Sequence, residues 1–223
     1  MEILVGQSQS RSALAIGVAG IAIFVSACSS SSANETKPKP KTIKINGHTY
    51  RIKAGANLAK ADLHEADLRG TDLSGADLTT ANLRSATLDG VSLKGADLTG
   101  ADLTGATLNG ANLSGAKLNL ANTRGAHLKG VDLHSANLTG ASMTGADLNG
   151  ADMHNVDLRN SDLRNTDLHA ADLHNADMRG INLGNANLSA SNLNGAILTG
   201  VTLTTTSLHA SSIGLAITTG VIW

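Results

Sequence analysis

GADLTGADLTGATLNGANLSGA, residues 95–116, has a leucine at every fifth position. An α-helix turns about 500° over five residues, so these leucines would scatter around its axis instead of forming one face. On a straight strand, the odd spacing would send successive leucines to opposite sides. The spacing therefore predicts a backbone that turns a corner within every five residues, so that each new short side again points its leucine inward.

This five-residue register runs without a slip from residue 58 to residue 213. Of its 32 central positions 27 are leucine, and the others are Thr123, Met143, Met153, Met178 and Ile213. Alanine stands two positions before 21 of the 32 centres, and glycine stands two positions after the centre in 16 cases. Two inward positions separated by one polar position are typical of a very short strand. Glycine and asparagine, which recur at the corner, tolerate the backbone conformations of turns.

Units such as Ala96-Asp97-Leu98 and Ala101-Asp102-Leu103, each followed by two polar or glycine residues, resemble the A(D/N)Lxx unit of the pentapeptide repeat proteins. The resemblance covers residues 56–213. It implies an all-β fold, a right-handed quadrilateral β-helix of about eight coils, with four pentapeptides per coil and with leucine and alanine inside. Thr123 is the one polar centre and Leu120 stands where glycine is usual, so we expect a local distortion of that coil.

The two ends of such a solenoid expose its apolar interior and unpaired strand edges, so each end needs a cap. Residues 41–52 alternate around an Asn46-Gly47 turn signal and predict a hairpin, and we assign residues 42–55 to an N-terminal cap. Residues 214–223 are largely apolar and predict a C-terminal cap or a homodimer contact. The side chains assigned to that role are Leu215, Ile217, Val221, Ile222 and Trp223.

The start of the chain has its own pattern. Arg11 precedes an apolar run, residues 13–27, that is short for a membrane span and suits a signal peptide. VSAC follows at residues 25–28. Residues 1–27 therefore resemble the signal peptide of a bacterial lipoprotein with its lipobox. The resemblance implies cleavage before Cys28 and acylation of its sulfur. The alternatives are an uncleaved anchor, since the start of the chain is only weakly basic, and an ordinary free or buried thiol.

Residues 28–41 are rich in serine and then in lysine and proline, which predicts a flexible, solvated tether. The chain is therefore expected to be exported and lipid-anchored to the bacterial membrane through Cys28, where its partner would be an unknown envelope protein. The segment 28–55 is basic, which favours an anionic membrane surface.

Charge bears on a second interpretation. Some pentapeptide repeat proteins bind DNA gyrase by imitating the acidic outline of duplex DNA, so the resemblance also suggests a topoisomerase inhibitor or protector. Residues 56–213 carry 16 acidic and 10 basic residues. The outward positions flanking one leucine lie side by side, so arginine should neutralise aspartate locally in the pairs Asp157–Arg159, Asp162–Arg164 and Asp177–Arg179. Export and this pairing both disfavour the DNA-mimic interpretation, and we expect no nucleic-acid partner.

A coil of twenty residues should stack positions twenty apart on one side. His134, His154 and His174 form such a set, and their outward partners are Asp132, Asp152 and Asp172. Neighbouring coils lie about 4.8 Å apart, so two imidazoles and a carboxylate could share Zn²⁺ or a similar ion. The alternatives are a pH-responsive face and a solvated surface without a binding role.

Catalysis finds no support in the sequence. Serine, histidine and aspartate recur throughout the repeats, so a triad-like grouping arises by chance. No insertion interrupts the repeats to form a concave site, and a P-loop, a dinucleotide fingerprint and paired CxxC motifs are absent. We therefore expect a non-enzymatic protein without a cofactor, acting as a rigid structural or protein-interaction scaffold. The metal-binding surface remains a further alternative.

Overall fold

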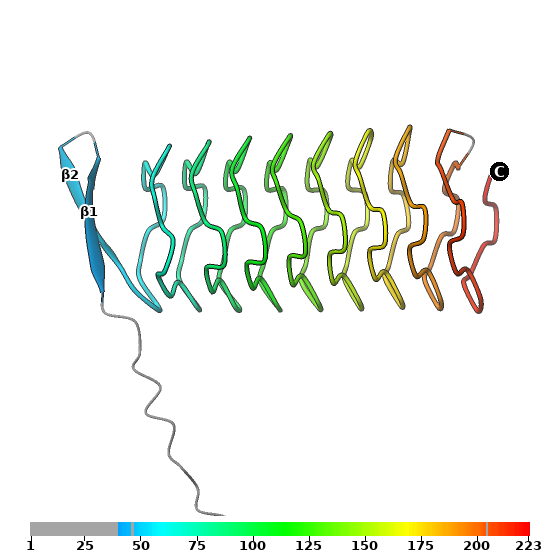
Figure 1. The fold of residues 1–223 in the computed structure, drawn as a ribbon, viewed down its shortest axis with the longest axis horizontal. Coiled ribbons are helices and arrows are strands. Elements are labelled where there is room, and N and C mark those ends of the chain that lie inside the picture. Colours follow the sequence, from blue (N-terminus) through cyan, green and yellow to red (C-terminus); the bar gives the residue numbers. More distant parts are fainter. Residues whose placement is uncertain (1–39, 46, 204) are drawn as a thin grey trace, which may run out of the picture. The chain divides into compact units, whose positions relative to one another are not determined.

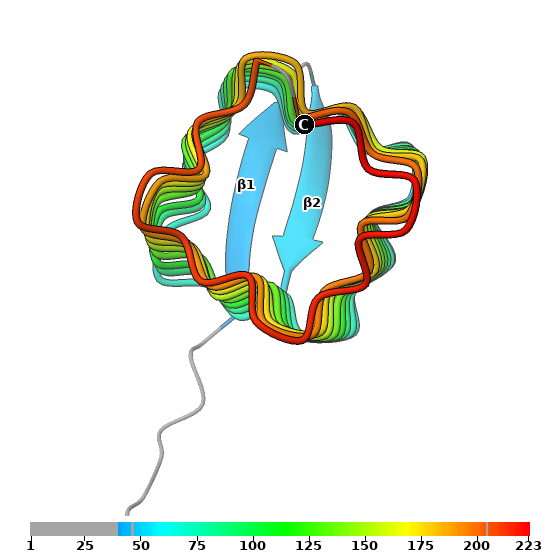
Figure 2. The same cartoon turned by 90° about the vertical axis from the view of Figure 1, so that its right-hand side faces the viewer.

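The computed structural model describes residues 40–45, 47–203 and 205–223. The repeat region is a column of stacked coils that begins behind a two-stranded hairpin (Figure 1). Viewed along its axis, the column has four sides, and the hairpin lies across one end (Figure 2). The predicted quadrilateral β-helix is confirmed. Within the described residues, no helix is long and apolar enough to span a bilayer. Cys28 and the predicted leader lie outside the described residues.

Each coil takes twenty residues, because parallel bridges join positions twenty apart from Asn57↔Asp77 to Thr202↔Ile222. The hydrogen bonds that hold neighbouring coils repeat in the same form along the column. The N–H of Leu98 donates to the carbonyl of Lys117 at 2.7 Å, and the N–H of Asp97 donates to the carbonyl of Ala76 at 2.9 Å. We use the word rung for the short segment that one coil places on one side of the column.

The corners described in the column are tight turns whose third residue has a positive φ, as Gly100, Asn155 and Ala170 do. At Leu98, the carbonyl accepts a hydrogen bond from the N–H of Ala101 at 2.9 Å, and Gly100 between them has φ 66°. A positive φ at this position alone is the mark of a type II turn and explains the preference for glycine and asparagine. Leu120 occupies the same position with φ 58°, at the energetic cost that a side chain incurs there.

The interior is filled by the two inward positions of each repeat, so leucine and alanine form one continuous core along the column. Polar residues enter the alanine position where their hydroxyl can donate to the carbonyl three residues earlier, as Ser161 does to Leu158 at 2.5 Å. Thr71, Thr166 and Ser191 do the same. Among the described residues, no buried side-chain nitrogen or oxygen lacks a hydrogen-bond partner.

The expected distortion around Thr123 was wrong. Its N–H donates to the carbonyl of Ser142 at 2.8 Å, the same bond that leucine makes in other coils. Its side chain is buried with 2% exposed, and its hydroxyl lies 3.4 Å from that same carbonyl. The backbone pattern holds because the inter-coil bonds do not depend on which side chain fills the core.

The predicted hairpin is confirmed. Strand β1 (Lys41–Ile45) pairs antiparallel with strand β2 (His48–Ile52), with Ile43 opposite Tyr50. Ile43, Ile45 and Tyr50 pack against the core of the column, and Ile52 is buried. The hairpin therefore covers the apolar opening of the first coil.

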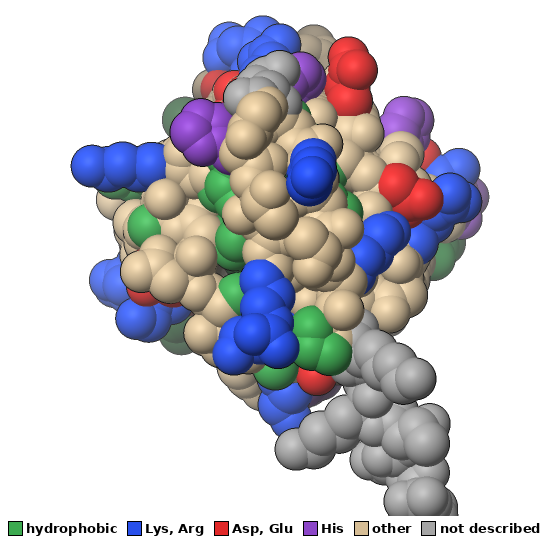
Figure 3. Space-filling view, turned by 90° about the vertical axis from the view of Figure 1, so that its left-hand side faces the viewer, with side chains coloured by type: hydrophobic (Ala, Val, Ile, Leu, Met, Phe, Trp, Pro, Cys, Tyr) green, Lys and Arg blue, Asp and Glu red, His purple; other side chains and the backbone are tan. Residues whose placement is uncertain are grey.

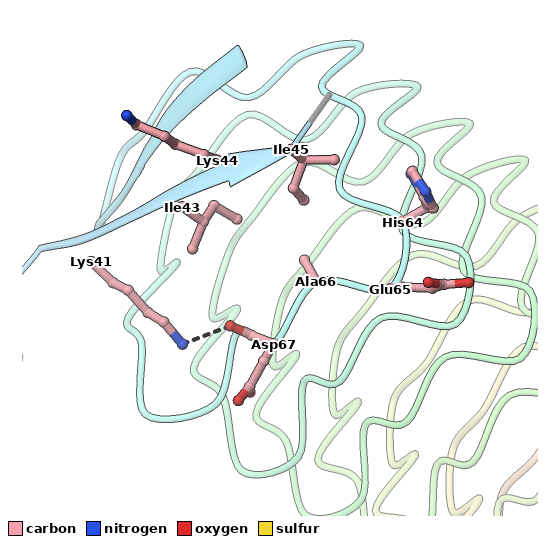
Figure 4. Close-up of a pocket in the computed structure, with 8 residues that line it drawn as sticks. All are labelled: Lys41, Ile43, Lys44, Ile45, His64, Glu65, Ala66 and Asp67. Atoms are coloured by element: carbon pink, nitrogen blue, oxygen red, sulfur yellow. Dashed lines mark hydrogen bonds between the residues drawn. The ribbon is translucent and has the colours of Figure 1, made fainter. Parts of the chain in front are cut away.

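Polar contacts also tie the hairpin to the first coil. The ammonium of Lys41 donates to the backbone carbonyl of Asp67 at 2.6 Å (Figure 4), and the N–H of Asp62 donates to the hydroxyl of Tyr50 at 3.2 Å. Between β1 and this coil lies a hollow of about 370 Å³, with Ile43 and Ile45 on one wall and residues 64–67 on the other. The hollow lies at the seam between cap and column.

At the other end, the bridges continue beyond residue 213, through Ile197↔Ile217 and Thr202↔Ile222. Residues 214–223 thus continue the coil geometry. Ile213, Ala216 and Val221 pack against the core, whereas Leu215 is 94% exposed and Trp223 is 63% exposed. Ile217 and Ile222 are also exposed. Whether this segment acts as a cap or as a contact with a second copy stays a prediction.

Candidate functional site: a histidine–aspartate ladder

Six side chains on three successive rungs of one side form the group that we call the His–Asp ladder: Asp132, His134, Asp152, His154, Asp172 and His174. The aspartates are joined by the parallel bridges Asp132↔Asp152 and Asp152↔Asp172, so each coil sets its pair directly beside the next. Aspartate precedes the buried leucine or methionine and histidine follows it, which turns both outward on the same rung.

Within each rung, the imidazole is bound to its own aspartate. The Nδ1 to Oδ1 distances are 2.6 Å at His134, 2.5 Å at His154 and 2.9 Å at His174. Because a carboxylate only accepts hydrogen bonds, Nδ1 carries the donated proton. The backbone N–H of each histidine donates to the same Oδ1 at 3.1 to 3.3 Å. Each aspartate therefore fixes both the position and the tautomer of its histidine.

Between rungs, the imidazoles stack. The ring centroids of His134 and His154 lie 4.9 Å apart at an interplanar angle of 5°, and those of His154 and His174 lie 5.0 Å apart at 3°. The predicted stacking of these residues is therefore present in the structure. The three histidines are half-buried, with 28 to 39% of each side chain exposed.

Ligand atoms from three of the residues lie within 4.8 Å of one another: Asp132, His134 and Asp152. Nitrogen and oxygen donors of this kind suit Zn²⁺ and other divalent transition metals. His154, Asp172 and His174 stand outside that compact group, although His154 and His174 belong to the same stack as His134. Burial raises the pKa of Asp172, but the hydrogen bonds and the charge of His174 together outweigh it, so the pKa lies below its usual value.

Elsewhere on the column, aspartate at the same position is paired with arginine. Arg159 binds Asp157 through two parallel hydrogen bonds of 2.9 and 2.6 Å. Arg164 and Arg179 bind Asp162 and Asp177 in the same way, so the three predicted pairs are all present. The hydrogen bonds from arginine hold the pKa of each of these aspartates below its usual value, although burial opposes them.

One further Asp–His pair was not anticipated from the sequence. Asp62 and His64 are joined through Oδ1 and Nδ1 at 2.8 Å, on a different side of the column. The signal was the same Asp-Leu-His spacing as at residues 132–134 and 172–174. Residues 84 and 104, after the centres of the next two coils on that side, are Arg84 and Thr104, so His64 has no histidine stacked on it.

These features define a solenoid protein of the right-handed quadrilateral β-helix class. The chain belongs to the pentapeptide repeat family, whose model matches residues 54–84, 81–119, 116–155, 126–165 and 166–204. Proteins of this family are generally structural or interaction proteins. A comparison with curated proteins gave no match.

Several solved structures are similar to the chain. HetL, a pentapeptide repeat protein involved in heterocyst differentiation regulation from the cyanobacterium Nostoc, is 33% identical over 75% of this chain and 82% of its own, with a TM-score of 0.40. A pentapeptide repeat protein from the thylakoid lumen of Arabidopsis thaliana is 34% identical over 44% of this chain and 68% of its own, with a TM-score of 0.43. QnrB1, a plasmid-mediated fluoroquinolone resistance protein, is 20% identical over 70% of this chain and 88% of its own, with a TM-score of 0.34.

Proposed function

We propose that the protein is a non-enzymatic scaffold of the bacterial cell envelope, anchored by a lipid on Cys28, which presents the sides of its column to an envelope protein. The observation that carries the proposal is the series of inter-coil bridges that extends from Asn57 to Ile222. Such a column is held together by contacts between neighbouring coils along its whole length, and it offers long, flat and polar surfaces instead of one recessed site.

The basic outer face of the hairpin is consistent with a membrane surface at this end of the column. On β1 and β2, the side chains alternate, so that Ile43 and Tyr50 face the core while Lys44 and Arg51 are exposed. Lys53 is exposed directly after β2, and the described residues 40–45 and 47–55 include no acidic residue. Lysine and arginine side chains gather over this end of the molecule (Figure 3). Each is worth about 1 kcal/mol near an anionic bilayer.

The position of Cys28 agrees with this orientation. It lies thirteen residues before Lys41 in the sequence, and a chain of that length spans at most about 45 Å even when fully extended. A lipid on Cys28 would thus hold the basic face of the hairpin within that distance of the membrane.

The alternative of a DNA mimic gains no support from the surface. A mimic of duplex DNA needs regularly spaced uncompensated negative charge, whereas Asp157, Asp162 and Asp177 each bind an arginine through two hydrogen bonds. Lys117 and Lys129 form ion pairs with aspartates on neighbouring rungs. The aspartates in these pairs are therefore neutralised by a basic neighbour.

The test is intact mass and membrane fractionation of the untagged full chain expressed in a bacterium, beside Cys28→Ala and the matched control Ser29→Ala. We expect wild type and Ser29→Ala to lose residues 1–27, to gain the mass of acyl chains and to sediment with membranes. Cys28→Ala should gain no acyl mass. If all three remain full-length in the soluble fraction, the envelope proposal is wrong, and inhibition of DNA gyrase becomes the activity to assay.

A further inference from the structure

We propose that the His–Asp ladder binds a divalent transition-metal ion, with Zn²⁺ as the reference case, between neighbouring histidines. The inference concerns only the repeat column and does not depend on lipidation or on the cellular location of the protein. It rests on three observations: the orientation of the imidazoles, their spacing, and the charge around them.

The orientation is that of a metal-ligating histidine. In metal sites, one ring nitrogen usually donates its proton to a carboxylate while the other binds the ion. In the ladder, Nδ1 of His134, His154 and His174 donates to Asp132, Asp152 and Asp172 respectively. This leaves Nε2 as the unprotonated nitrogen of a neutral imidazole. The structure therefore holds three histidines in the tautomer that a metal requires before any ion binds.

The spacing permits two neighbouring histidines to share one ion. Zn–N bonds of about 2.0–2.1 Å place two nitrogens about 3.4 Å apart in a tetrahedral site and at most about 4.1 Å apart. The parallel rings of His134 and His154 have centroids 4.9 Å apart. Because the rings are parallel, both must rotate about their side-chain bonds before their Nε2 atoms point at one ion, and both side chains are partly exposed to solvent, which leaves room for this rotation. Asp132 and Asp152 accept the Nδ1 protons and so lie on the other side of each ring from Nε2, and water would complete the coordination of the ion.

The charge around the ladder favours a cation. The ladder carries three carboxylates, and within the described part of the chain each forms its ion pair with a histidine and none with lysine or arginine. The rungs on either side are neutral: Asn112 and Ser114 precede the ladder, and Asn192 and Asn194 follow it. The amide of Asn192 donates to Asp172 at 3.0 Å. In the Asp–Arg pairs elsewhere on the column, arginine cancels the charge of aspartate. In the Asp–His pairs of the ladder, a neutral imidazole leaves that negative charge in place.

The experiment is calorimetric titration of ZnCl₂ into the untagged full chain with Cys28→Ala as the background, so that no thiolate competes. The three histidines make two neighbouring pairs that share His154. His154→Ala destroys both pairs, and we expect it to weaken binding about 100-fold. His134→Ala and His174→Ala each leave one intact pair, and we expect each to weaken binding by no more than about fivefold. The ratio between these variants is the readout that distinguishes a shared site from separate histidines.

His64→Ala is the matched control, because His64 makes the same contact with an aspartate but stacks on no other histidine. It should bind Zn²⁺ like the background protein. Circular dichroism of each variant checks that the column is intact, which we expect since all four side chains point outward. The proposal is overturned if His154→Ala binds as tightly as the background protein, if the three ladder variants are equally weakened, or if His64→Ala loses as much affinity as His154→Ala.

Discussion

Thr123 is the residue at which the core departs most from its own pattern. It fills a central position that is otherwise leucine, methionine or isoleucine, and beside it lies a cavity of about 10 Å³ bounded by leucines and Met143. Its hydroxyl, 3.4 Å from the carbonyl of Ser142, is too far for a strong hydrogen bond. Thr123→Leu should therefore raise the free energy of unfolding by about 1–2 kcal/mol, because it buries more apolar surface and fills the cavity.

Chemical denaturation of the purified protein, with Thr123→Val beside it, measures this effect. Valine removes the hydroxyl and adds almost no volume, so its stability should lie between those of wild type and Thr123→Leu. A leucine variant less stable than wild type would mean that the core around residue 123 is already filled and that the larger side chain strains it.

At the same scale, the inward and outward role of each residue could be predicted from the sequence, because leucine and alanine recur in one unbroken register. The pairing of Asp157 with Arg159 followed from the same alternation, and so did the stacking of His134, His154 and His174. The regular backbone at Thr123 did not follow. The sequence of this repeat shows only that a polar side chain enters the core. The backbone conformation of the repeat is determined by its hydrogen bonds to the coils on either side.

At the scale of the element, the hairpin does for the first coil what a preceding coil does for the others. In the interior, the N–H of Asn82 donates to the carbonyl of Ala61 in the coil before it, at 2.9 Å. The equivalent N–H of Asp62 has no coil before it and donates to the hydroxyl of Tyr50. Tyr50→Phe removes this acceptor, and we expect hydrogen exchange at the amide of Asp62 to become about fivefold faster, which corresponds to about 1 kcal/mol.

Residue-resolved hydrogen exchange measures this, and Thr49→Ala is the control because Thr49 lies on the outer face of the same strand. Equal exchange at Asp62 in wild type and Tyr50→Phe would show that the hydroxyl does not protect this edge. The hairpin itself was predictable from alternation around Asn46-Gly47. The roles of Tyr50 and Lys41 were not, because they depend on where the strands lie against the coil, which no local pattern records.

At the scale of the whole molecule, the period of twenty residues means that the sequence position of a side chain fixes both its coil and its side. Removing one pentapeptide should preserve the column, since the remaining repeats keep their five-residue register. Every residue after the deletion, however, moves to the adjacent side of the column. Removing residues 141–145 and 161–165 together would leave all three ladder histidines in the chain and place them on three different sides.

This double deletion should retain the circular dichroism of a β-helix and lose Zn²⁺ binding to the extent that His154→Ala does. Its matched control is the deletion of residues 81–85 and 101–105, which shortens the column equally and moves the ladder as one body. Both deletions remove the same number of contacts between coils, so their thermal midpoints should fall by similar amounts. If Zn²⁺ binds equally to both deletion variants, affinity depends on the number of histidines and not on their stacking. The alignment of the histidines by the coils is then not required for binding. If only the control binds, the periodicity of the fold is what assembles the site.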